Sequence, residues 1–222
     1  MLRLLNRDRK QHHLESVVMQ DDLRSVARKH SMDMAEKDYF DHVNLKGKSP
    51  SDRLKLSRVT DIASGENLAK IGGHGNPTQV AETGLMNSPG HRANILNGRF
   101  NAVGVGVVKS AAGVYYFTQN FAHRDVLFEG RIPESVRRKK GLRLRGRVFT
   151  DVKHIYVRVS HPGTSVAVAE ISHLVKGNSF AFTVPFQSPG IYEASVFVDH
   201  AGLGQHTLAN RFQIRVRRGF IL

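Results

Sequence analysis

The chain contains no cysteine, and it has few acidic residues for its number of basic ones. Without cysteine, neither a disulfide framework nor a thiolate metal site can form. This absence fits a cytoplasmic protein and equally an exported protein that is large enough to fold without disulfides. No apolar run approaches the roughly 20 residues that span a bilayer, so the sequence predicts no transmembrane segment.

The opening residues, MLRLLNRDRK, lack the pattern of a secretory signal. A charge occurs already at Arg3, where such a signal has its apolar stretch. We therefore expect either a cytoplasmic protein or an exported one whose export signal is not in this chain.

The charge balance is strongly basic. The chain has 33 Lys and Arg against 19 Asp and Glu, a formal net charge of +14. Residues 1–124 carry 18 basic and 12 acidic groups, and residues 125–222 carry 15 and 7. Such an excess favours anionic partners: nucleic acid, anionic lipid or wall polymer. The 222 residues, 40% of them hydrophobic, suit a soluble protein of one large or two modest domains.

Residues 1–124 combine helix and strand patterns. Asp21 and Asp22 stand where a helix should begin, and apolar residues follow at helical spacing over 23–35. A second helix is expected to open at Asn76-Pro77. A short third one has Ser88 as its N-cap and continues to Leu96.

A β-hairpin is expected next, over 102–109 and 114–121. In its first strand, valines occupy every second position and share one face. The glycines between them, Gly104 and Gly106, leave room for a close neighbour on the other face.

After His123 the helical periodicity ends, and short alternating segments are separated by turn residues. About seven strands at this spacing predict a β-sandwich of the immunoglobulin-like kind, with a turn at Gly202–Gly204. We expect two domains, 1–124 and 125–222. The expected strands include 146–148, 154–159, 166–171, 179–184, 192–198 and 212–216.

Five stretches of the first domain are informative together. They are ARKHSMDMA (27–35), YFDH (39–42) with Gly47, Pro50 and Arg53, GENLA (65–69), MNSPGHRANIL (86–96), and VGVGV (103–107) followed by YFTQNF (116–121). In this order and spacing they resemble the CAP superfamily, which includes cysteine-rich secretory proteins, venom allergens, plant pathogenesis-related proteins and bacterial SCP-like proteins. GENLA and MNSPGHRANIL are typical of the bacterial branch. The resemblance covers nearly all of residues 1–124.

The resemblance implies an α-β-α sandwich, so the whole chain is expected to be α+β: a CAP domain followed by an all-β sandwich. It also implies a polar cleft in which two histidines and two acids gather, and in which the histidines can hold zinc or a similar ion. By motif, the histidines are His42 and His91, and one acid is Glu66. Ser88 occupies the place of the second acid, and Leu85 that of the usual tryptophan.

The chemistry of these residues is intelligible without the family. Two neutral imidazoles suit Zn²⁺, although two protein ligands predict a weak site. Glu66 could act as a catalytic base on a bound water, or orient one imidazole from behind. The alternative is structural: Glu66 caps backbone N–H groups, Asn67 completes a polar network, and His91 hydrogen-bonds across a loop.

Four other residues need an interpretation. Ser88 could be a nucleophile, but capping of a helix explains a Ser-Pro pair. His30 lies on the apolar stripe of its helix, which favours a packed or partly exposed histidine and not a ligand. Gln119 and Asn120 either reach the cleft or pair across strands.

A basic run begins the second domain. Arginines alternate with Leu142, Leu144 and Gly146, which predicts a strand with one cationic and one apolar face. The run is either a contact for anionic polymer or lipid headgroups, or a solvated linker with a charged edge strand that resists aggregation. It has no interleaved aromatic residue, and no RRM, KH or zinc-finger pattern occurs, so nucleic acid is not expected as a partner. The basic residues are Arg137, Arg138, Lys139, Lys140, Arg143, Arg145 and Arg147.

Three functional hypotheses follow. The first is an extracellular or cell-surface binding module whose cleft takes a small ligand such as a lipid, sterol or glycan. The second is a metal-assisted hydrolase, such as a peptidase, with Glu66 as base and an ion on His42 and His91. The third is adhesion to an anionic cell-surface polymer through the basic sandwich.

Overall fold

The computed structural model describes residues 1–73, 75–200 and 204–218, and it divides into two compact units. The first comprises Met1–Val59 and Ala63–His123, and the second comprises Thr60–Ile62 and the chain from Arg124 onward. In the second unit, Arg124 donates to both carboxylate oxygens of Asp61, at 3.1 and 2.6 Å. A short segment from the middle of the first part of the sequence therefore belongs to the second unit, so the division is not a single cut.

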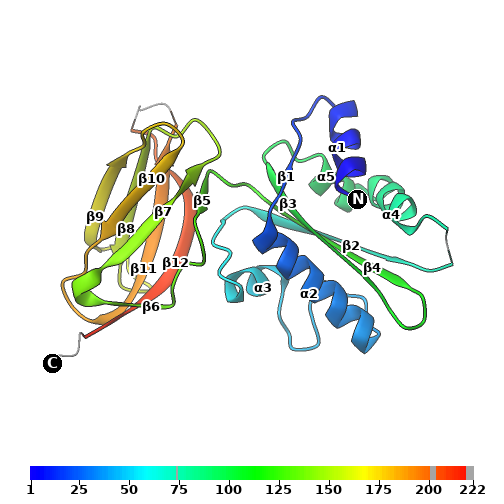
Figure 1. Cartoon of the computed structure of the whole chain (residues 1–222), viewed down its shortest axis with the longest axis horizontal. Helices are drawn as coiled ribbons and strands as arrows, with labels where there is room; N and C mark the ends of the chain where they lie inside the picture. The colour runs from blue at the N-terminus through cyan, green and yellow to red at the C-terminus, as the bar shows by residue number, and fades with distance from the viewer. Residues whose placement is uncertain (74, 201–203, 219–222) are drawn as a thin grey trace. The chain divides into compact units, whose positions relative to one another are not determined.

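Among its described residues, the first unit has five helices and a four-stranded sheet (Figure 1). Its strands are ordered β1-β3-β4-β2, with β1 parallel to β3 and the other pairs antiparallel. The helices predicted at Asp21, Asn76 and Ser88 and the hairpin are confirmed. The elements are α1 (Leu2–Gln11), β1 (Val18–Met19), α2 (Asp21–Lys37), α3 (Pro50–Leu56), β2 (Ser64–Ile71), α4 (Pro77–Asn87), α5 (Pro89–Ile95), β3 (Ala102–Lys109) and β4 (Tyr115–Ala122).

Helices cover both faces of this sheet, as the resemblance implies. On one face, α1, α4 and α5 contribute Leu5, Leu85 and Ile95 to a core with Val103 and Phe121. On the other, Leu23 and Val26 of α2 and Leu54 of α3 pack with Ala102 and Ala122. The sheet therefore lies between two helical layers (Figure 1).

The two glycines of β3 allow α2 to lie directly on the sheet. A Cβ on Gly104 would lie 2.1 Å from the carbonyl carbon of Leu23, and one on Gly106 would lie 2.3 Å from that of Ala27. No side chain fits at such distances, so the expectation of a close neighbour is confirmed. This contact fixes α2 against the sheet face that carries part of the candidate site.

Helix α1 was not predicted, and a buried arginine holds it in place. Arg9 is 1% exposed and donates to the backbone carbonyls of Glu15, Ile95, Asn97 and Phe100 at 2.7–3.0 Å. Four carbonyl dipoles therefore satisfy the guanidinium where no carboxylate does. They connect α1 to the end of α5 and to the loop before β3.

The second unit has eight strands among its described residues, in two sheets ordered β10-β7-β5 and β6-β12-β11-β8-β9. All six of the strand segments named from the sequence are confirmed. The two strands that were missed, β5 and β6, have three residues each, too few for an alternating pattern. Residues 201–203 of the predicted turn lie outside the described residues. The strands are β5 (Val126–Phe128), β6 (Ser135–Arg137), β7 (Leu142–Val148), β8 (His154–Ser160), β9 (Ala167–Leu174), β10 (Ser179–Val184), β11 (Gly190–Asp199) and β12 (Thr207–Arg217).

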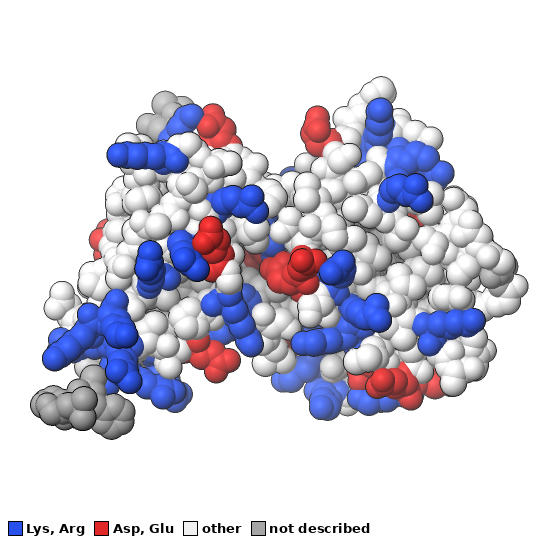
Figure 2. Space-filling model, viewed as in Figure 1, with Lys and Arg blue, Asp and Glu red and all other residues white. Residues whose placement is uncertain are grey.

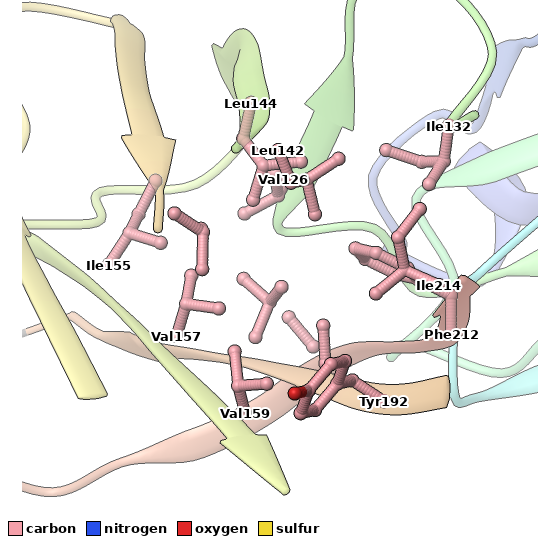
Figure 3. Close-up of a cluster of buried hydrophobic side chains, with 14 of the residues drawn as sticks. Val126, Ile132, Leu142, Leu144, Ile155, Val157, Val159, Tyr192, Phe212 and Ile214 are labelled. Carbon is pink, nitrogen blue, oxygen red and sulfur yellow. The ribbon is translucent and has the colours of Figure 1, made fainter. Parts of the chain in front are cut away.

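The two sheets share one apolar core (Figure 3). Leu142 and Leu144 of β7 contribute to it from one sheet, and Ile155 and Val157 of β8 from the other. Each such buried side chain contributes about 1.5–3 kcal/mol relative to exposure to water. Near the start of β11, the hydroxyl of Tyr192 donates to the carbonyl of Ser188 at 2.9 Å.

The prediction of a charged edge strand is wrong. Strand β7, which carries Arg143, Arg145 and Arg147, pairs with β10 on one side and β5 on the other and is therefore central in its sheet. The short β5, which was not predicted, pairs with the edge of β7 that is not paired with β10. The predicted alternation is confirmed, because the three arginines are exposed and the residues between them are buried.

Candidate functional site

The candidate site forms at β2, which lies at one edge of the first sheet. Glu66 and Asn67 are consecutive on this strand, so their side chains point to opposite faces of the sheet. Their register partners in β4 are Asn120 and Gln119. Two adjacent rungs of the ladder thus present four polar side chains, two on each face.

Glu66 is nearly buried, and both of its carboxylate oxygens have partners. Oε1 lies 2.8 Å from His42 Nδ1, and Oε2 accepts from the Arg53 guanidinium at 2.5 Å. With its amide nitrogen toward Glu66, Asn120 donates to Oε2 at 3.1 Å and accepts from the Ala27 N–H at 3.3 Å. Glu66 therefore contacts side chains from three segments and does not cap a turn.

Arg53 holds the loop that carries His42. Helix α3 begins with a capping box, in which Ser49 and Asp52 satisfy each other's backbone N–H groups. From the middle of this helix, Arg53 donates to the backbone carbonyls of His42 at 2.6 Å and Lys48 at 2.9 Å. The same guanidinium thus joins the loop to Glu66 on β2.

His30 fixes the residue before His42. It is 1% exposed, and its Nε2 lies 3.0 Å from the carbonyl oxygen of Asp41. Burial lowers the pKa of His30, and the charge of Arg53 lowers it further. The predicted packed histidine is confirmed: it is neutral near pH 7 and donates one hydrogen bond to the loop.

His42 is about half exposed, and Glu66 favours its charged form. The hydrogen bond to Glu66 raises the pKa of His42, against the opposite effect of burial. A raised pKa in the folded state means that this interaction stabilises the fold fully below about pH 6.5 and is lost as the pH rises through the folded value. Since Nδ1 is engaged, Nε2 is the nitrogen left for a ligand.

His91 reaches the same edge from the other face of the sheet. Its carbonyl accepts from Asn67 Nδ2 at 3.0 Å, while its ring makes no hydrogen bond with any described residue. Burial lowers the pKa of His91, and the charge of His42 lowers it further. The two predicted histidines are therefore electrostatic neighbours, one favouring the charged and the other the neutral form.

A polar network extends from this edge across one face of the sheet. Asn67 accepts from Asn94 at 2.9 Å and donates to Gln119 at 3.0 Å, and Asn94 also donates to the Glu66 carbonyl. Gln119 in turn donates to Glu82 of α4 at 2.9 Å. Asn67 and Gln119 are thus members of one polar network that joins β2, β4, α4 and α5. This agrees with the structural interpretation of Asn67.

Glu82 is a buried acid that the sequence reasoning missed. It is 0% exposed, and burial, with a further effect from Asp8, raises its pKa to about 7. The available signal was its position beside Ala81 and three residues before Leu85, on the apolar face of α4. It lies nearly two turns before Ser88, so it does not occupy the family's second-acid position.

Ser88 does not make the predicted cap. It is the N-cap residue of α5 by position, but its side chain makes no capping hydrogen bond. It also ends α4, where its N–H bonds the carbonyl of Leu85. Its hydroxyl makes no hydrogen bond to His91 or Glu66, so the structure gives it no activated oxygen.

The described residues contain no cluster of three or more His, Cys, Asp or Glu side chains arranged to hold a metal ion. An ion at this site would therefore depend on the two imidazoles and water. Among the same residues, no helix has both the length and the apolar character needed to cross a membrane.

The seven predicted basic contacts do not form one surface. Arg143, Arg145 and Arg147 lie on the exposed face of the three-stranded sheet, whereas Arg137 lies on β6, in the five-stranded sheet. The two sheets share the core between them, so their exposed faces point away from each other.

The family comparison matches the first unit. The CAP model, described as the cysteine-rich secretory protein family, covers residues 2–121. The chain therefore belongs to the CAP family, and the interpretation based on the five stretches is confirmed.

Three similar proteins from Bacillus species illustrate this membership. YkwD of Bacillus subtilis is 38% identical over 121 residues, which is 54% of this chain and 45% of YkwD. The membrane protein YlbC of the same organism is 38% identical over 124 residues, 56% of this chain and 34% of YlbC. The chain thus spans less than half the length of both. An extracellular SCP-domain protein of Bacillus anthracis is 33% identical with a TM-score of 0.49, over 55% of this chain and 39% of that protein.

Replacing Glu82 should change how stability depends on pH. The folded protein keeps this proton to about pH 7, whereas the unfolded chain releases it near the ordinary value of 4.5. The free energy of unfolding should therefore fall as the pH rises between these values. Relative to Glu82→Gln, which keeps the bond from Gln119, the wild type should lose about 3 kcal/mol between pH 4 and pH 8.

Urea denaturation across this pH range measures the difference. Glu36→Gln, at an exposed glutamate of α2, is the matched control and should follow the wild type. Parallel pH profiles for Glu82→Gln and wild type would contradict the assignment of a proton to Glu82.

Proposed function

We propose that the candidate site at the β2 edge binds a small ligand with a polar head and an apolar part, and that the protein is a binding module. The observation that carries this proposal is that both carboxylate oxygens of Glu66 already have hydrogen-bond partners. Its two oxygens are taken by His42, Arg53 and Asn120, so it positions neighbouring groups and leaves His42 Nε2 for a ligand.

The loop around His42 supports an apolar part in the ligand. Phe40, Val43 and Leu45 are 45%, 47% and 64% exposed, all within four residues of His42. Single exposed apolar residues are ordinary, but three beside a polar site suit contact with an apolar group. This favours a lipid or sterol, which has a continuous apolar part, over a glycan, whose many hydroxyls need hydrogen-bonding partners.

The charge of His42 supports a polar or anionic head. Because Glu66 raises its pKa, the imidazole tends to carry a proton on Nε2 that can be donated to a carboxylate or phosphate oxygen. The Arg53 guanidinium already bonds two carbonyls and Glu66, so it acts by holding the loop.

We also propose that His42 and His91 can hold zinc weakly. A carboxylate behind Nδ1, as Glu66 stands behind His42, is the usual arrangement for a metal-binding imidazole. Bound zinc would supply a Lewis acid. Two protein ligands give modest affinity, and protonation of His42 competes with the metal at lower pH.

The hydrolase alternative has less support. It requires Glu66 to take a proton from water, yet neither oxygen is without a partner. To act as a base, Glu66 would first have to break its contact with Arg53 or His42. The free-energy cost of breaking that contact favours the binding module.

We infer that the second unit is an immunoglobulin-like module. Strands β5, β7 and β10 oppose β6, β12, β11, β8 and β9, and β6 runs parallel to β12. A tyrosine near the start of β11 bonds the backbone four residues upstream, a feature of that fold. The family's description names secretory proteins, which supports an extracellular or cell-surface location.

The apolar contact can be tested with dodecanoate, a carboxylate on an apolar chain. Val43→Ser should weaken its binding about fivefold, because a valine contact of roughly 1 kcal/mol is lost. Val18→Ser is the matched control, since Val18 is 51% exposed and lies on β1 at the opposite edge of the sheet. Calorimetry at pH 7 measures both. Equal affinity for the two variants, or no binding by the wild type, would count against the proposed ligand class.

The metal proposal is tested by calorimetric titration with Zn²⁺. Wild-type protein should bind one ion at pH 7.5 and bind it more weakly at pH 6, where His42 is protonated. The double variant His42→Ala/His91→Ala should lose binding, while His12→Ala/His161→Ala, which removes two exposed histidines elsewhere, should keep it. Zinc affinity that survives in the first double variant would place the ion elsewhere.

A further inference from the structure

Basic side chains from separate segments meet at one end of the five-stranded sheet. Arg137 is the last residue of β6, and β12 runs parallel beside it. In this pairing Arg217 is the register partner of Arg137, and Arg215 is the partner of Ser135. The three arginines therefore lie on the same exposed face, although about 80 residues separate them in the sequence.

A fixed turn adds further charges. Arg138–Lys140 form a single 3-10 turn directly after β6. Gly141 closes it at φ +66°, and a Cβ there would lie 2.6 Å from the carbonyl oxygen of Val184. The turn is thus packed against the end of β10, which argues against a solvated linker.

We call these residues the basic end. All of them are exposed, and Figure 2 shows Lys and Arg side chains gathered at the lower left, where β6 and the end of β12 lie in Figure 1. They are Arg137, Arg138, Lys139, Lys140, Arg215, Arg217 and Arg218.

Within the described part of the chain, no carboxylate forms an ion pair with the basic end. The nearby acids pair with other arginines: Glu134 with Arg131 at 3.9 Å, and Glu193 with Arg211 at 3.5 Å. Like charges placed directly opposite on paired strands are destabilising, as Arg137 and Arg217 are here. A bound anion would remove this repulsion.

We propose that the basic end binds a linear polymer whose negative charges are phosphate groups. Neighbouring strands lie about 5 Å apart, and alternate residues on one strand about 7 Å apart, so a flexible chain can bring successive phosphates to separate arginines. This surface is distinct from the candidate site of the first unit, and the inference does not depend on that site's ligand.

The composition of the basic end favours such a polymer over a membrane or a nucleic acid. Among the described neighbours on the same face, Ile191, the register partner of Arg215, is an exposed large apolar side chain. One such residue is a poor basis for insertion into a bilayer. The described segments that carry the basic end, 134–141 and 213–218, contain no aromatic side chain on which bases could stack.

The proposal is tested by measuring the binding of linear inorganic polyphosphate by calorimetry at several salt concentrations. Each phosphate contact adds about 0.7 to the slope of log affinity against log salt for a single-stranded chain. Seven contacts predict a slope of about −5 for the wild type. The variant Arg137→Gln/Arg138→Gln/Arg215→Gln/Arg217→Gln should give about −2 and at least tenfold weaker binding at low salt.

The control variant Lys10→Gln/Arg28→Gln/Lys29→Gln/Lys55→Gln removes the same charge from exposed positions of the first unit. It should keep the wild-type slope and affinity. Thermal unfolding should show that the arginine variant is folded, since the substitutions relieve repulsion. Equal loss in both variants, or an unchanged slope in the arginine variant, would overturn the proposal.

Two further probes distinguish the source of the phosphate. Phosphatidylglycerol vesicles and a single-stranded oligonucleotide, each at equal phosphate concentration, should bind more weakly than polyphosphate. Tighter binding of the vesicles through the same four arginines would assign the surface to a membrane. Tighter binding of the oligonucleotide would assign it to nucleic acid, and either result would overturn the polymer proposal.

Discussion

The candidate site depends on the contacts that the buried Glu66 carboxylate makes with His42 and Arg53. One oxygen bonds His42 and the other bonds Arg53, whose guanidinium also holds two carbonyls of the loop that carries His42. A buried carboxylate is stable only when its charge is compensated and its lone pairs are satisfied. The arrangement meets both requirements, and in doing so it fixes a solvent-exposed loop against the edge of a sheet.

Close packing of α2 on β3, away from the His42 loop, helps to position Glu66. Because β3 has glycine at 104 and 106, α2 lies against its backbone. The helix then supplies the Ala27 N–H to Asn120, and Asn120 reaches Glu66. On the other face, Asn67, Gln119 and Glu82 continue the polar network beneath α5 toward α4. The candidate site is thus the exposed end of a buried polar network.

Local patterns explain which elements could be predicted. The starts of α2, α4 and α5 have helix-terminal residues, and the β3–β4 hairpin has strict alternation, so both were found. The partners of Arg9 are four carbonyls, three of them in a distant segment, so no local pattern indicated its role. Strand β5 was missed because three residues are too few for an alternating pattern. Glu82 lies on the apolar face of its own helix, and this local signal was overlooked. An edge strand was one of two interpretations of residues 142–148, and it is excluded because the distant β5 and β10 pair with both sides of β7. Ser88 was expected to cap α5, but its side chain makes no capping hydrogen bond. His42, Glu66 and His91 came from family motifs; their protonation preferences required the structure.

The most direct test of this account is the pKa of His42, measured by NMR titration of the imidazole in the wild type and in Glu66→Gln. The glutamine keeps the shape of the side chain and removes its charge. The account predicts a pKa above the ordinary histidine value of about 6.5 in the wild type and a lower one in the variant. An identical His42 titration in the two proteins would contradict the central role assigned to Glu66.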